Sequence, residues 1–161
     1  LKSGGGHDMA AGLGLDETQL ADFEMFLIDR AQAVFSGMPQ RIFNYSRSLS
    51  VAGCSSELVE GLNTVGPFGA GHPEPRFVIT HCRLKNLRWM GKEKEHLSVQ
   101  LDDGTDEPLR AVSFGVAGTK LGQFLTVTPD PGPVQVLGRL QRDNWRGGGA
   151  VQFLIEDIAA S

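Results

Sequence analysis

Five strand-like runs fill the second half of the chain, and their order restricts the folds that it can adopt. Each run is rich in β-branched and apolar residues. Between the third and fourth runs lies a stretch, 118–125, that can hold one or two helical turns. This is the order of an OB-fold barrel, although other small barrels and a sandwich also fit. The runs span 76–90, 96–101, 109–114, 134–140 and 150–158.

The first 65 residues follow a different pattern, in which helices alternate with a strand. Apolar residues recur at intervals of three and four over 16–35, which is the period of an amphipathic helix. The run 41–51 is rich in β-formers and predicts a strand. A second helix is predicted over 55–64, with Ser55 or Ser56 as its N-cap.

A change of composition marks a boundary between these two parts. The segment 66–75 (GPFGAGHPEP) contains three prolines and three glycines, which exclude a helix there. We therefore expect an α+β chain with one part over 1–65 and a five-stranded barrel over 66–161. Because the first residue is Leu1 rather than Met, we also expect the chain to be a fragment of a larger protein.

Composition indicates a folded protein in a reducing environment. The 161 residues are 40% hydrophobic and 21% charged, which is typical of a globular protein. The two cysteines, Cys54 and Cys82, lie far apart and predict neither a zinc site nor a disulfide framework. No apolar run is long enough to cross a bilayer. We therefore expect a cytoplasmic protein without a membrane partner.

Basic and aromatic residues of the second part predict binding of single-stranded nucleic acid. From Arg76 to His96 there are six Lys and Arg residues and two Glu residues. Positive grooves hold the phosphates of single strands, and aromatic faces stack on their bases. Alternatively, the tryptophans plug the barrel ends and the basic residues form an ordinary solvated face. The candidate substrate-binding residues are Arg88, Trp89, Lys92, Trp145 and Arg146.

A glycine-rich stretch at the start of the chain is a candidate phosphate-binding loop. In Gly4-Gly5-Gly6-His7 the backbone N–H groups can turn toward one anion, and His7 adds a side-chain donor. The following residues, 9–12 (MAAG), suit the start of a helix. Alternatively, the stretch is a flexible turn or a remnant of an expression vector. The sequence contains no set of catalytic or metal-binding motifs that would complete an active site.

Taken in order, several short motifs resemble the C-terminal half of the RecJ family. This family comprises bacterial single-strand-specific 5′-to-3′ DNA exonucleases of the DHH phosphoesterase superfamily. The chain departs from the family at His72, where Asn is usual before Pro-Glu-Pro. The matching motifs are GGGH (4–7), MAAG (9–12), GPFG (66–69), PEP (73–75), His96-Leu97, Asn144-Trp145, VQF (151–153) and IEDI (155–158).

The resemblance implies an architecture and a role for each part. Residues 1–65 would be the end of a DHH-associated domain, and 66–161 an OB domain that guides the DNA strand. Gly5, Gly6 and His7 would contact the phosphate of the nucleotide, with His7 supporting catalysis. The metal-binding DHH domain, which would hold Mg²⁺ or Mn²⁺, would be missing, so we expect no cofactor in this fragment.

Two functions follow as hypotheses. In the first, the chain is the substrate-binding part of a metal-dependent exonuclease of DNA repair and recombination, and is inactive by itself. In the second, it is a stand-alone OB module that binds single strands or a protein without catalysis. A DHH motif with spaced aspartates upstream of Leu1 would favour the first hypothesis.

Overall fold

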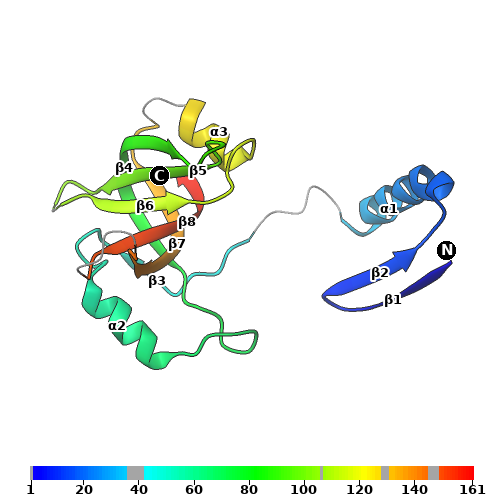
Figure 1. The fold of residues 1–161 in the computed structure, drawn as a ribbon, viewed down its shortest axis with the longest axis horizontal. Helices are drawn as coiled ribbons and strands as arrows, with labels where there is room; N and C mark the ends of the chain where they lie inside the picture. The colour runs from blue at the N-terminus through cyan, green and yellow to red at the C-terminus, as the bar shows by residue number, and fades with distance from the viewer. Residues whose placement is uncertain (1, 36–41, 106, 128–130, 145–148) are drawn as a thin grey trace. The chain divides into compact units, whose positions relative to one another are not determined.

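The computed structural model describes residues 2–35, 42–105, 107–127, 131–144 and 149–161. Contacts divide the chain into two compact units, Leu1–Phe43 and Asn44–Ser161. Figure 1 shows the helices and strands that make up each unit.

The N-terminal unit consists of a β-hairpin followed by a helix. Strand β1 (Ser3–His7) pairs antiparallel with β2 (Ala10–Gly14). A short 3-10 helix, η1 (Glu17–Gln19), leads into α1 (Leu20–Val34), so the predicted helix over 16–35 is confirmed. None of the described helices combines the length and the apolar character that crossing a membrane requires.

This hairpin corrects the prediction for the glycine-rich start of the chain. Residues 9–12 do not begin a helix, because Ala10–Gly14 forms a strand. The N–H groups of residues 4–7 do not converge on one point either, because successive N–H groups of a strand point in opposite directions. Gly6 is required for the close approach of the two strands, since a Cβ there would lie 2.7 Å from the carbonyl oxygen of Ala10.

The second unit contains a closed five-stranded barrel (Figure 1). β4 (Phe77–Met90) pairs antiparallel with both β5 (His96–Asp102) and β7 (Val134–Arg142). β5 pairs with β6 (Leu109–Ser113), and β7 with β8 (Val151–Ala160). A parallel pairing between β6 and β8 closes the barrel. Together with α3 (Lys120–Val127) between β6 and β7, this connectivity confirms the predicted OB-fold barrel and the α+β class.

Alternation of apolar and polar residues explains the barrel interior. Every second residue of β5 is buried. The residues of the other strands that face the barrel interior supply the rest of the core. Burial raises the pKa of the Cys82 thiol to about 11, so this side chain stays protonated and packs as a small apolar group. The fully buried side chains include Ile79, Cys82, Val99, Leu101, Val134, Val136 and Phe153.

Two helices cover different parts of the barrel core. On α3, Leu125 packs with Leu97 and Val116 in a separate apolar cluster. α2 (Ser56–Val65) contributes the buried Val59 to the main core. Its N-cap is Ser55, whose hydroxyl accepts a hydrogen bond from the Leu58 N–H at 3.3 Å, as one of the two predicted caps.

Residues 44–65 belong to the same compact unit as the barrel. β3 (Arg47–Leu49) runs parallel to the start of β4, so only three residues of the predicted strand over 41–51 pair with another strand. Arg41, the first residue of that prediction, lies outside the described residues. The assignment of 1–65 and 66–161 to two different family domains stays a prediction.

An ion-pair network joins the proline-rich segment 66–75 to the barrel. Glu74 pairs with Arg139 at 2.8 Å, and Glu156 accepts hydrogen bonds from both Arg139 and Arg76. Burial disfavours the charged form of Glu156, but the two arginines outweigh it and hold the pKa of this carboxyl below its ordinary value. The network therefore fixes the end of the segment against β7 and β8.

We expect Gly138→Ala to destabilise the barrel strongly. A Cβ at Gly138 would lie 2.1 Å from the Leu154 carbonyl oxygen and 2.7 Å from the Phe153 ring, so β7 and β8 would have to separate. The expected loss in the free energy of unfolding is about 1–3 kcal/mol or more. Urea denaturation followed by tryptophan fluorescence measures it. The control is Gly61→Ala on α2, where a Cβ meets nothing within 4 Å and should be neutral or stabilising.

The Glu156 network predicts a pH-dependent stability. Because its pKa is lowered in the folded state, the Glu156 carboxylate stabilises the fold above its ordinary pKa of 4.5. This contribution is lost as pH falls below that value. We therefore expect Glu156→Gln to be less stable than the wild type at pH 7, with the difference shrinking as the pH falls below about 4.5. A difference that stays constant over this range would contradict the prediction. Glu60→Gln, in an exposed pair with Arg142, is the control and should cost at most about 1 kcal/mol.

Candidate nucleic-acid interface

The outer surface of β4, β5 and β6 forms one continuous face, called here the outward face. Arg88 on β4 lies opposite Ser98 on β5, and Arg110 on β6 lies opposite Gln100 on β5. Directly opposed residues of an antiparallel pair share a face, as do alternate residues of one strand. Because the residues of β5 between these positions are buried, both arginines project away from the barrel core.

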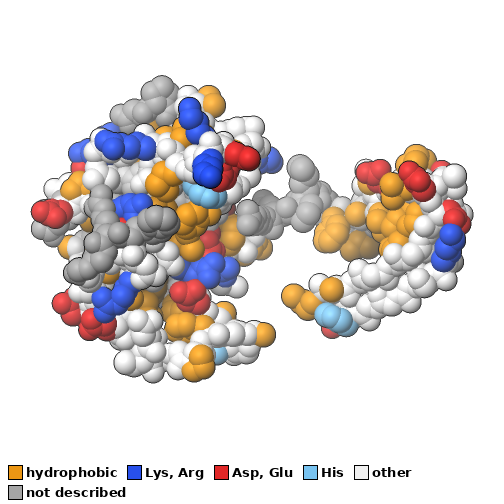
Figure 2. Space-filling model, viewed as in Figure 1, with side chains coloured by type: hydrophobic (Ala, Val, Ile, Leu, Met, Phe, Trp, Pro, Cys, Tyr) orange, Lys and Arg blue, Asp and Glu red, His pale blue; other side chains and the backbone are white. Residues whose placement is uncertain are grey.

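This face is basic, and part of its charge is free of ion pairs. Lys85 forms an ion pair with Asp102, and the hydrogen bond from Lys85 holds the pKa of the Asp102 carboxyl below its usual range. Arg88 on this face and Lys92 in the turn between β4 and β5 are exposed, and no acidic side chain among the described residues pairs with them. Figure 2 shows Lys and Arg side chains around apolar ones over β5 and β6. The face can therefore attract the phosphates of a nucleic acid.

Trp89 does not share this face with Arg88. It lies opposite Leu97, which is buried in the cluster with α3, and its side chain is 38% exposed. Consecutive residues of a strand point to opposite sides, so the structure separates two neighbours that the sequence pattern groups together. Trp145 and Arg146 lie outside the described residues.

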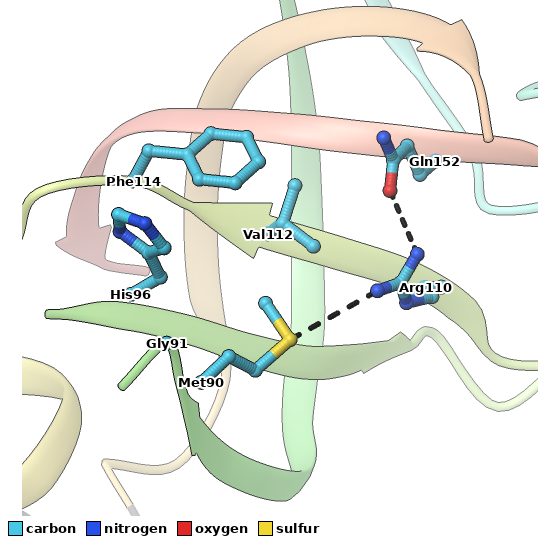
Figure 3. Close-up of a pocket in the computed structure, with 7 residues that line it drawn as sticks. All are labelled: Met90, Gly91, His96, Arg110, Val112, Phe114 and Gln152. Carbon is cyan, nitrogen blue, oxygen red and sulfur yellow. Dashed lines mark hydrogen bonds between the residues drawn. The ribbon is translucent and has the colours of Figure 1, made fainter. Parts of the chain in front are cut away.

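A cavity of about 370 Å³ opens on the outward face (Figure 3). Its lining comes from the end of β4, the start of β5, β6 and β8. The second and third strands of an OB barrel, here β5 and β6, are the usual ligand face of this fold. The lining residues are Met90, Gly91, His96, Arg110, Val112, Phe114 and Gln152.

Arg110 is held in place by a buried carboxylate at one end of this cavity. Its Nη1 donates to Asp143 at 2.5 Å and to the Gln152 Oε1 at 2.9 Å, and the Asp143 side chain is 1% exposed. Asp143 in turn is the last described residue but one before the loop that contains Trp145. The guanidinium therefore has a fixed orientation, unlike that of the exposed Arg88.

At the other end of the cavity, His96 positions an exposed aromatic ring. The Gly115 N–H donates to the His96 Nδ1 at 3.0 Å, and the ring of His96 meets that of Phe114 edge-on at 5.1 Å. Phe114 remains 53% exposed and offers a face on which a planar ligand can stack.

The sequence pattern alone does not single out Arg110, Phe114 and Gln152. Arg110 lies on β6, Phe114 directly follows β6 and Gln152 lies on β8, so they line one cavity only because β6 pairs with β8. The spacing within the run 109–114 could have grouped part of this set. Arg110, Val112 and Phe114 occupy alternate positions of that run, and alternate residues of a strand lie on one face.

The N-terminal candidates lie in the other unit. Gly5 and Gly6 belong to β1, and His7 ends it; all three are exposed. The Met9 N–H donates to the His7 Nδ1 at 3.3 Å, so Nε2 is the ring nitrogen that can contact a ligand. Among the residues that the structure describes, no three His, Cys, Asp or Glu side chains come together as a metal site, so these residues offer no fit for a catalytic metal ion.

Comparisons with known proteins agree with this architecture. The sequence model of the RecJ OB domain matches residues 46–157. The single-stranded-DNA-specific exonuclease RecJ of Salmonella typhimurium is 31% identical over 160 residues, covering 96% of this chain and 26% of that protein. The protein of the same name from Bacillus subtilis is 24% identical over 161 residues, covering 98% of this chain and 19% of that protein.

A solved structure shows the same fold. RecJ from Thermus thermophilus, in complex with Mn²⁺, superposes with a TM-score of 0.66 at 25% identity, covering 99% of this chain and 22% of that one. The chain thus spans about a quarter of the length of the relatives that it matches. On the match over residues 46–157, the chain belongs to the RecJ family, and this region is its OB domain.

Proposed function

We propose that this chain is the strand-binding, C-terminal part of a single-strand-specific 5′-to-3′ DNA exonuclease that acts in DNA repair and recombination in the cytoplasm. The observation that carries the proposal is the outward face, where Arg88, unpaired among the described residues, shares the surface of the second and third strands of an OB barrel with an aromatic cavity. Its membership of a family whose relatives are named as single-stranded-DNA-specific exonucleases supports the choice of ligand.

The outward face and the turn between β4 and β5 together have the two components that a single strand requires. Arg88 and Lys92 are long, exposed cations that can follow the phosphate backbone. Phe114 supplies an aromatic surface for a base, and duplex DNA cannot use it because its bases are stacked inside the helix. Trp145 and Arg146 remain proposed contacts of the same strand, and Trp89 remains a proposed contact on the other side of β4.

The hairpin of the N-terminal unit would contact the nucleotide that is being hydrolysed. His7 is exposed at the end of β1 and is proposed to contact the phosphate of the reacting nucleotide. Gly5 and Gly6 have no side chains and would allow the DNA to approach the backbone of β1. The Mg²⁺ or Mn²⁺ ions of the parent enzyme would be held by its DHH domain. The chain alone is therefore proposed to bind DNA without hydrolysing it.

We expect single-strand affinity to depend on salt and on Arg88. Each phosphate that a cation neutralises contributes about −0.7 to the slope of log K against log salt concentration. Arg88→Gln should therefore weaken binding of labelled oligothymidine and reduce this slope by about 0.7, as fluorescence anisotropy can measure. Arg47→Gln is the matched control, because Arg47 is an exposed arginine on β3, beside the opposite end of β4.

Two results would count against strand binding by the outward face. One is an equal loss of affinity in Arg88→Gln and Arg47→Gln, which would indicate a nonspecific charge effect. The other is equal affinity for single-stranded and duplex DNA, since stacking on Phe114 requires an unpaired base.

Kinetics of the complete parent enzyme test the different roles proposed for the two units. His7→Ala should lower kcat by on the order of 100-fold if the phosphate contact strengthens in the transition state. Arg88→Gln should mainly raise KM, because nucleotides on the barrel do not react. Steady-state kinetics on a long single strand measure both values. If His7→Ala leaves kcat unchanged, the role proposed for the hairpin is wrong.

A further inference from the structure

The Arg110 end of the cavity has hydrogen-bond donors that no strong acceptor among the described residues uses. Gln152 is 5% exposed, and its Oε1 accepts from Arg110, which turns its Nε2 away from the guanidinium. Among the described residues this Nε2 has no hydrogen-bond partner. Within the part of the chain that the structure describes, the Nη2 of Arg110 has only the Met90 sulfur, a weak acceptor, at 4.0 Å. A ligand that fills this end must therefore offer acceptors.

The rest of the cavity suits a flat ring. Phe114 and His96 form one end, Arg110 lies at the other, and Val112, which is 1% exposed, lies between them (Figure 3). Arg110 lies on β6 and Phe114 follows the last residue of that strand, four positions later, so the chain between them spans at most roughly 13 Å. This length accommodates a base and its sugar, with the base between the aromatic end and the donors.

We propose that the cavity binds one base of the single strand and prefers guanine; this inference rests on the proposed strand binding. Guanine offers two adjacent acceptors, O6 and N7, and arginine contacts to this edge are the commonest specific contacts to a base. Adenine has the same N7 but carries an amino donor in place of O6, which would face the donors of Arg110 and Gln152. Both purines can stack on Phe114, so the difference between them arises at the donor end.

Base analogues in the unaltered chain test this directly. Oligothymidine strands with one central guanine, adenine, hypoxanthine or 7-deazaguanine are compared by fluorescence anisotropy. Guanine and hypoxanthine, which both keep O6 and N7, should bind about 5- to 100-fold more tightly than adenine. 7-Deazaguanine, which lacks N7, should lose part of this advantage. The series does not depend on the folding of any variant.

Variants then assign the preference to the cavity. Arg110→Lys keeps a cation beside Asp143 but removes the planar pair of amino groups, and Gln152→Leu removes the amide donor. Each should reduce the ratio of guanine to adenine affinity. Arg88→Gln is the control: it should weaken both strands by the same factor and leave the ratio unchanged.

The outcomes distinguish this inference from the proposed function. Equal affinity for guanine and adenine, with binding that is still salt-dependent and selective for single strands, overturns the guanine pocket alone. Equal affinity for guanine and 7-deazaguanine also overturns it. If the chain binds no single strand at all, both the pocket and the proposed function fail.

Discussion

The barrel depends on β4, the strand that pairs with two neighbours. Its first part pairs with β7 and its second part with β5, so it must bend between them. The register shifts lie between Ile79 and Cys82 and between Lys85 and Arg88, and at each one a residue adopts a positive φ, 56° at His81 and 52° at Asn86. Such bulges re-aim the side chains that follow. The bend at Asn86 thus determines which face Arg88 and Met90 occupy.

Closure of the barrel also creates the cavity. The parallel pairing of β6 with β8 brings Gln152 beside Arg110, although the two are far apart in the sequence. The same closure sends Ala111 and Phe153 inward, so the residues that flank them must face out. Core packing and the composition of the outward face are therefore two results of one register.

The sequence predicts the elements of this fold better than its sites. It predicts the barrel strands to within a few residues, because their apolar residues alternate with polar ones and the interior requires that pattern. It does not predict the hairpin, because Gly4–Gly6 have no side chains that could indicate a strand. Arg88 and Trp89 are neighbours in sequence, whereas the strand points them to opposite faces. Arg110, Phe114 and Gln152 can be joined only by knowing which strands are neighbours.

The cations of the outward face and of the turn between β4 and β5 differ in whether an acidic side chain holds them, and this difference affects how they can bind a ligand. Arg88 and Lys92 are exposed and unpaired among the described residues, so they can adjust to a moving backbone and act through charge. Arg110 is neutralised by Asp143, which weakens its attraction for phosphates at a distance. Its orientation is fixed, however, and fixed donors lose little entropy when a ligand binds. The free cations therefore favour attraction of any strand, and the anchored one favours discrimination between bases.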